Sequence, residues 1–197
     1  MAGEFAEGGG EVVGTGGCVV YALAQILRRE RPRMSASEKG IEKELVPLLT
    51  KYKPILGGHA DPGDEALGKY HFALMHDYLR RRSITLKGLH KPAKRPFDLS
   101  DFERTKARTF LLIGLRSNKR RAGPNSQPFI RGAHFSWAHK QSWAHVVPMF
   151  RVENKKTKFR IREKGVREEH NENFLFNEES ESLFMQLTRV YYVIENK

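Results

Sequence analysis

The only cysteine of the chain stands where a glycine-rich turn meets a largely apolar stretch. Cys18 follows residues 14–17 (Gly-Thr-Gly-Gly) and precedes residues 19–27. The apolar stretch predicts a helix over residues 18–29, and the positive end of a helix dipole favours a thiolate over a thiol. The glycines leave room for a substrate backbone to approach the sulfur. A cysteine in this setting is either an enzymatic nucleophile or a small buried apolar residue, and the glycine-rich turn favours the nucleophile.

A histidine opens an apolar segment in the second half of the chain. His145 begins the sequence His-Val-Val-Pro-Met-Phe-Arg-Val, which predicts a strand over residues 145–152. An imidazole beside a thiolate serves as the base of cysteine hydrolases, so Cys18 and His145 together predict that chemistry. The tetrapeptide Ser-Trp-Ala-His occurs twice, ending at His139 and at His145, and only His145 leads directly into the apolar segment.

Basic residues outnumber acidic ones, and they occur in short runs. The 197 residues include 35 Lys and Arg against 23 Asp and Glu, which gives a formal net charge of +12. This balance favours attraction to nucleic acids or to acidic proteins. The sequence contains neither a zinc-finger spacing nor a phosphate-binding Gly-rich loop. The basic runs comprise residues 28–33, 80–82, 87–95, 119–121 and 155–162.

The composition predicts a soluble intracellular protein, cytoplasmic or nuclear. A single cysteine excludes an intramolecular disulfide, so nothing indicates an oxidising compartment. Residues 1–10 lack the basic and apolar regions of a secretory signal. No window approaches the roughly 18–20 apolar residues that span a membrane, so no membrane partner is expected. The basic run at residues 119–121 is compatible with nuclear import.

The spacing of apolar residues predicts helices in the first half of the chain. Ser35 and Glu38 have the spacing of a capping box for the second of these helices. Pro47 is expected to kink or end the same helix. Helices are expected over residues 18–29, 37–51 and 64–82, after a flexible Gly-rich leader over residues 1–13.

The second half changes to apolar segments of strand length. Helices followed by strands describe an α+β protein, with a helical lobe over about residues 14–100 and a β lobe over about residues 101–197. A cleft between these lobes would bring Cys18 to His145. Strands are expected over residues 109–115, 145–152, 158–162 and 187–194.

Five segments match one known family in their order and spacing. Residues 16–24 (Gly-Gly-Cys-Val-Val-Tyr-Ala-Leu-Ala) resemble the start of a nucleophile helix, and residues 145–152 resemble the strand that follows a catalytic histidine. The separation of Cys18 and His145 is close to the roughly 130 residues found in papain-type enzymes. The chain thus resembles the papain family of cysteine peptidases. Further similar segments lie at residues 34–38, 57–84 and 128–135.

This resemblance implies a papain-like fold. It also implies an enzyme that hydrolyses peptide or protein substrates without a cofactor or metal ion. Cys18 would attack the peptide carbonyl as a thiolate, and His145 would protonate the leaving amine. Aligning the family's next strand with residues 159–162 places Glu163 where the family has an asparagine that orients the imidazole. A carboxylate can accept the same hydrogen bond. The backbone N–H of Cys18 would form part of the oxyanion hole.

Three alternatives remain open at this point. The family has an oxyanion-hole glutamine a short way before its cysteine, and Val12 occupies that position here. Because a donor of the oxyanion hole would be missing, the first alternative is a catalytically impaired pseudo-protease that binds a protein partner. The net positive charge also allows a nucleic-acid-binding module. A metal site built from His134, His139 and His145 is the third alternative, although no partner cysteine or helical His pair accompanies it.

Overall fold

The computed structural model describes residues 17–57, 64–90, 97, 99–117, 142–155, 159–162 and 185–194. The chain divides into two compact units, and the division falls between Leu86 and Lys87. The predicted leader over residues 1–13 lies outside the described residues. In the part of the chain that is described, no helix is long and apolar enough to cross a membrane.

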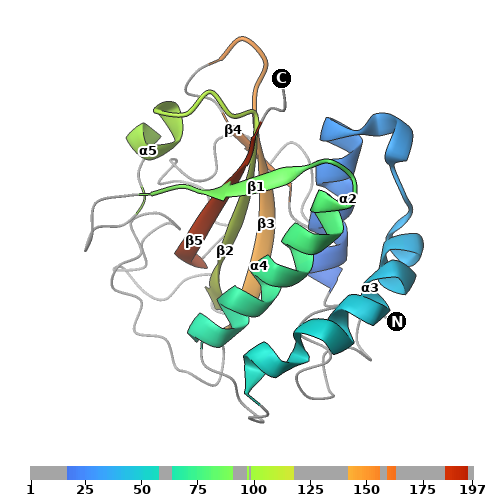
Figure 1. Ribbon diagram of the computed structural model, residues 1–197. Helices are drawn as coiled ribbons and strands as arrows, with labels where there is room; N and C mark the ends of the chain where they lie inside the picture. Colours follow the sequence, from blue (N-terminus) through green and yellow to red (C-terminus); the bar gives the residue numbers. More distant parts are fainter. Residues whose placement is uncertain are drawn as a thin grey trace. The chain divides into compact units, whose positions relative to one another are not determined.

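The first unit contains the three predicted helices, which Figure 1 draws from blue to green. Each begins and ends within about two residues of its expected position. The helix α2 contacts both other helices, and α3 and α4 lie side by side. The elements are α2 (Gly17–Glu30), η1 (Pro32–Met34), α3 (Glu38–Tyr52), η2 (Lys53–Leu56) and α4 (Asp64–Arg80).

The capping residue of α3 differs from the sequence prediction, and the helix continues past Pro47. Ser37, and not Ser35, is the N-cap, because its side-chain oxygen accepts the backbone N–H of Gly40 at 3.1 Å. The predicted capping box of Ser35 with Glu38 is therefore wrong. Pro47 does not end the helix, which continues to Tyr52. The buried side chains on either side of the proline, Leu45 and Leu48, keep this part of α3 in the core.

The core of the first unit is built around α2. Its buried residues lie on most sides of the helix, since α2 packs against both of its neighbours. The other two helices each contribute one apolar stripe, as expected for amphipathic helices. The fully or almost fully buried residues are Val19, Val20, Ala22, Leu23, Ala24, Ile26 and Leu27 of α2, Ile41, Leu45 and Leu48 of α3, and Tyr70, Leu74, Met75, Tyr78 and Leu79 of α4.

The described strands form one five-stranded sheet in the order β1-β5-β2-β3-β4. The pairs β2–β3, β2–β5 and β3–β4 are antiparallel. The first strand spans the point where the two units meet along the chain. The elements are β1 (Thr85–Gly88), α5 (Leu99–Glu103), β2 (Thr109–Ser117), β3 (Ser142–Arg151), β4 (Phe159–Ile161) and β5 (Met185–Ile194).

An aromatic cluster forms the core of the second unit. Phe110 of β2 meets Phe102 of α5 with ring centres 5.3 Å apart, and it meets Phe159 of β4 at 5.8 Å. Both contacts are edge-on, the arrangement that aromatic quadrupoles favour. The cluster comprises Phe97, Phe102, Ala107, Phe110, Leu112, Val147, Met149, Phe159, Ile161 and Val190.

The predicted α+β class is confirmed, because the chain combines helices with an antiparallel sheet. All four expected strands are present. The short elements β1 and α5 were not predicted; β1 lies in the stretch assigned to the helical lobe, and α5 spans the expected lobe boundary near residue 100. Both are too short for a hydrophobic period to be visible in the sequence.

Candidate functional site

Cys18 occupies the first turn of α2, as the sequence predicts. It is the second residue of a 14-residue helix, and its side chain is partly exposed. The next residues, Val19 and Val20, are fully buried and hold this end of the helix in the core. The first N–H groups of a helix point out of its N-terminal end, where they favour negative charge. The location therefore suits a thiolate and an oxyanion.

His145 lies inside a strand and not at its start, which corrects the predicted boundary. The strand β3 begins three residues earlier because Ser142 pairs with Ser117, and the ladder runs on to pair His145 with Gly114. The β2–β5 pairing shifts register between Ile113 and Gly114. Such bulges are common beside active sites because they re-aim neighbouring residues. The side chain of His145 lies outside the described residues.

Glu163 also lies outside the described residues, one position beyond Arg162. The strand before it pairs with β3 in an antiparallel direction, with Met149 opposite Ile161. The backbone N–H of Arg162 donates to the carbonyl of Pro148 at 3.0 Å. From Phe159 to Arg162 the chain therefore runs alongside β3 in the direction that leads from Arg151 to His145.

The three predicted catalytic residues fall in different parts of the chain. Cys18 belongs to the first unit and His145 to the second, so their pairing stays a prediction. His134 and His139, which the alternative metal site requires, lie outside the described residues. Among the residues that are described, no group of three or more His, Cys, Asp and Glu side chains is arranged to hold a metal ion.

A polar cluster joins α3 and α4 that was not predicted from the sequence. The carboxylate of Asp77 accepts from Lys51 Nζ at 2.7 Å and from the Tyr52 hydroxyl at 2.6 Å. It also accepts from Arg81 Nε at 3.0 Å. These donors, first Lys51, then Tyr52 and Arg81, hold the pKa of Asp77 well below its ordinary value. Only 11% of the Asp77 side chain is exposed, whereas the Lys51 and Arg81 side chains are mostly exposed, so the cluster joins the two helices at the edge of their interface.

A second cluster joins the same two helices. The Tyr78 hydroxyl donates to Glu44 Oε2 at 2.9 Å, and Arg82 forms an ion pair with the same carboxylate. The Arg82 guanidinium lies over the Tyr78 ring, 3.8 Å from its centre. Burial, and then the hydrogen bond to Glu44, raise the pKa of Tyr78. The spacing of Asp77 and Arg81 was visible in the sequence, but their partners on α3 were not.

Replacing Asp77 by asparagine should lower the free energy of unfolding by about 1.5–3 kcal/mol near pH 7, because charged hydrogen bonds are lost. The lowered pKa means that the carboxylate stabilises the fold at pH values above its unfolded pKa. This contribution is lost as the pH falls through the folded pKa. Urea unfolding should therefore show a smaller difference between wild type and variant at about pH 3 than at about pH 7.

The matched control for this experiment is Glu42→Gln. Glu42 lies on α3 and has no ion pair within the described part of the chain. It should change stability by less than about 0.5 kcal/mol at either pH. Equal effects of the two variants would contradict the role assigned to Asp77.

Arg151, at the end of β3, has a structural role. Its guanidinium donates to the carbonyls of Phe102, Thr105 and Ala107 at 2.8, 2.8 and 3.0 Å. It also lies 4.8 Å from the centre of the Phe159 ring. Burial lowers its pKa, although the group stays cationic at neutral pH. The side chain thus ties the segment between α5 and β2 to the end of β3.

Comparison with known proteins adds no relative. No family model matches the chain, and neither the curated proteins nor the solved structures include a significant match to it. The features that bear on function are therefore a partly exposed cysteine at a helix start and a histidine on an antiparallel strand.

Proposed function

We propose that this chain is a papain-like cysteine-type peptidase with Cys18 as nucleophile and His145 as base. The observation that carries the proposal is the location of Cys18, partly exposed in the first turn of a helix whose remaining residues are largely buried. This environment favours the thiolate form and offers outward N–H groups to a developing oxyanion. The proposal extends to an intracellular protein, since a lone thiol persists in a reducing compartment.

The proposed reaction has two steps. The Cys18 sulfur attacks the carbonyl carbon of a peptide bond, and the oxyanion forms near the backbone N–H of Cys18. The C–N bond then breaks while the His145 imidazolium gives its proton to the leaving amine. Water next attacks the thioester and loses a proton to His145, and the carboxylic acid product leaves with the thiolate restored.

Glu163 is the proposed orienting group for His145. It follows β4, whose antiparallel pairing with β3 carries the chain in the direction of His145. A carboxylate that accepts the second imidazole N–H fixes the tautomer and the orientation of the ring. A positioning role of this kind is tested by Glu163→Gln, which should lower kcat with less effect on KM and shift the acid limb of the pH profile.

A catalytically impaired scaffold is the second candidate function. It is favoured by Val12, whose side chain cannot donate a hydrogen bond at the position where papain-like enzymes have a glutamine. Loss of one oxyanion donor costs about 10²–10³ in turnover in a serine protease. In this case the fold would bind a protein without cleaving it.

Hydrolysis of fluorescein-labelled casein separates the two candidates. A peptidase should release labelled fragments, and iodoacetamide or His145→Ala should reduce the rate by at least about 10³-fold. Release that persists after complete alkylation of Cys18 would contradict a thiol mechanism. Absence of release over many hours, with intact protein by circular dichroism, would support the scaffold.

A further inference from the structure

The first unit carries an arginine-rich surface where the C-terminal ends of two helices meet. The Arg31 guanidinium, just after α2, donates to the carbonyl of Ser83, just after α4, at 3.0 Å. This contact brings together two basic runs that are far apart in the sequence. The arginines of these two runs are called the arginine surface. It comprises Arg28, Arg29, Arg31, Arg33, Arg80, Arg81 and Arg82.

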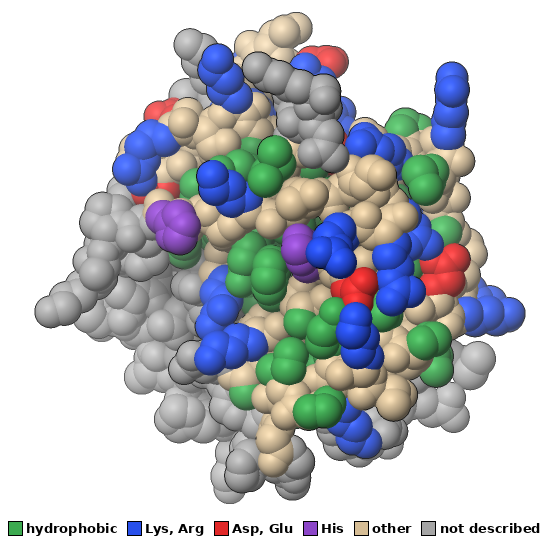
Figure 2. Space-filling view, in the orientation of Figure 1, with side chains coloured by type: hydrophobic (Ala, Val, Ile, Leu, Met, Phe, Trp, Pro, Cys, Tyr) green, Lys and Arg blue, Asp and Glu red, His purple; other side chains and the backbone are tan. Residues whose placement is uncertain are grey.

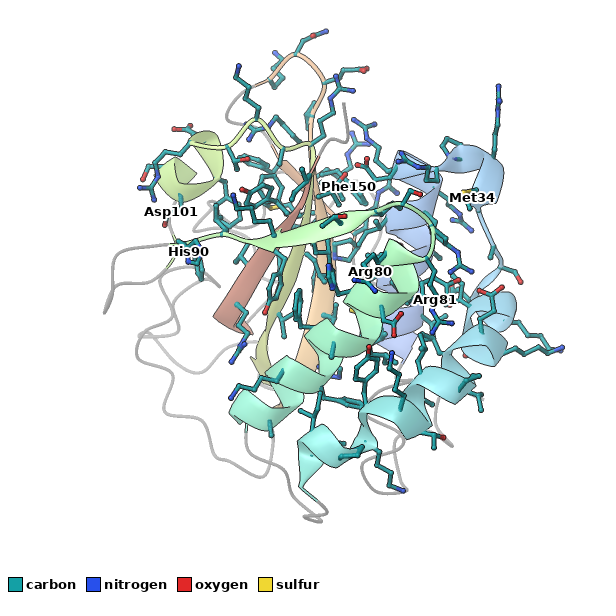
Figure 3. The ribbon with its side chains drawn as sticks, viewed as in Figure 1. Met34, Arg80, Arg81, His90, Asp101 and Phe150 are labelled. Carbon is teal, nitrogen blue, oxygen red and sulfur yellow. The ribbon has the colours of Figure 1, made fainter. Side chains whose placement is uncertain are left out.

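Much of this charge is available to a ligand. Arg28, Arg29, Arg33 and Arg80 are exposed, and none forms an ion pair with any residue that the structure describes. Figure 3 labels Arg80 and Arg81 at the end of α4. The surface contains arginines but no lysine. A guanidinium presents a planar fork of donors that matches phosphate oxygens two at a time.

An aromatic pair on α4 lies on the N-terminal side of Arg80. The rings of Phe72 and His76 are stacked, with centres 5.0 Å apart and planes inclined by 14°. Both residues are partly exposed, and exposed Lys69 and Arg80 lie on the same helical face, one before and one after the pair. In the same orientation, Figure 2 shows basic, histidine and hydrophobic side chains together over this part of α4.

We propose that the arginine surface and the Phe72–His76 pair form a binding site for single-stranded nucleic acid. The arginines contact phosphates, and a base stacks against the exposed part of the aromatic pair. An acidic protein would need the charges alone, whereas the rings beside exposed guanidinium groups favour a ligand with both phosphates and bases. This activity does not depend on the proposed peptidase reaction.

Binding is measured by fluorescence anisotropy with a labelled single-stranded RNA of about 20 nucleotides, from about 50 to about 200 mM salt. Arg28→Gln/Arg80→Gln removes one exposed arginine from each helix end. It should weaken binding at least about tenfold, because two phosphate contacts are lost. Each phosphate contact contributes about 0.7 to the salt slope of single-strand binding, so the slope should become shallower by about 1.4.

The control, Lys106→Gln/Lys155→Gln, removes the same charge from two exposed lysines of the second unit. It should leave the affinity within about twofold of wild type. His76→Ala tests the stacking contact without changing the charge. Burial, and then Arg80, lower the pKa of His76, so the imidazole ring is neutral at about pH 7.5. This variant should bind about fivefold more weakly with an unchanged salt slope.

Three results would overturn the proposal. Equal losses in the arginine variant and the lysine control would show attraction by net charge alone. An unchanged affinity of His76→Ala would remove the stacking contact. Displacement of the RNA by a polyglutamate peptide at equal or lower concentration would identify an acidic protein as the better ligand. Circular dichroism of each variant confirms that it is folded before binding is measured.

Discussion

Replacing Cys18 by alanine is expected to lower the hydrolysis of labelled casein by about 10⁵–10⁶-fold, the effect of removing the nucleophile from a hydrolase of this kind. Without the sulfur no thioester forms, and the imidazole alone does not activate water well enough to cleave a peptide bond. The measurement is the initial rate of fragment release under saturating casein, for wild type and variant purified in the same way.

The fold should survive this substitution. Cys18 is partly exposed and lies in the first helical turn, while the buried residues of α2 begin at Val19. Alanine has the highest helix propensity, so α2 should keep its length. Unchanged circular dichroism together with lost hydrolysis would assign a chemical role to the sulfur. Hydrolysis within about tenfold of wild type would exclude Cys18 as the nucleophile.

Truncation of Phe110 to alanine should lower the free energy of unfolding of the second unit by about 3–5 kcal/mol. Phe110 is fully buried and makes edge-on contacts with the Phe102 and Phe159 rings. Its removal leaves a cavity among α5, β2 and β4 that these rigid neighbours cannot fill. Guanidinium unfolding monitored by circular dichroism provides the measurement.

Val46→Ala is the control for this loss. Val46 lies on α3 with 58% of its surface exposed, and alanine is the better helix former. Its effect should stay within about 0.5 kcal/mol of zero. A loss below about 1 kcal/mol in Phe110→Ala would mean that the aromatic cluster is not the core of the second unit.

The long elements were predictable because each repeats its apolar pattern over several turns or pairs. The buried residues of α2, such as Leu23, Ile26 and Leu27, recur at helical spacing. In β2 and β3 the buried segments Phe110–Ile113 and Val146–Met149 are continuous, as expected for strands covered on both faces. The α+β class follows from the order of these patterns along the chain.

Boundaries and short elements were less predictable because tertiary contacts decide them. Ser35 and Ser37 are equally good N-cap residues by type, and only the backbone after η1 places Ser37 where it accepts from Gly40. The earlier start of β3 depends on pairing with Ser117 across a long chain separation. No local pattern in residues 142–144 contains that information.

The candidate site shows the same contrast. The position of Cys18 in a first helical turn followed from its local sequence, and the structure confirms it. The cluster around Asp77 was missed because two of its donors, Lys51 and Tyr52, come from another helix. Pairing of Cys18 with His145 is a long-range property of the same type, so it needs a direct measurement.

The rate of Cys18 alkylation by iodoacetamide as a function of pH is the most direct measurement of that pairing. We predict fast labelling of the native protein that persists below about pH 6 and is lost in His145→Ala, because a thiolate–imidazolium pair reacts where an ordinary thiol does not. Labelling that rises only near pH 8.5, the range of an unperturbed thiol, would contradict the account. Identical pH profiles for wild type and His145→Ala would contradict it as well.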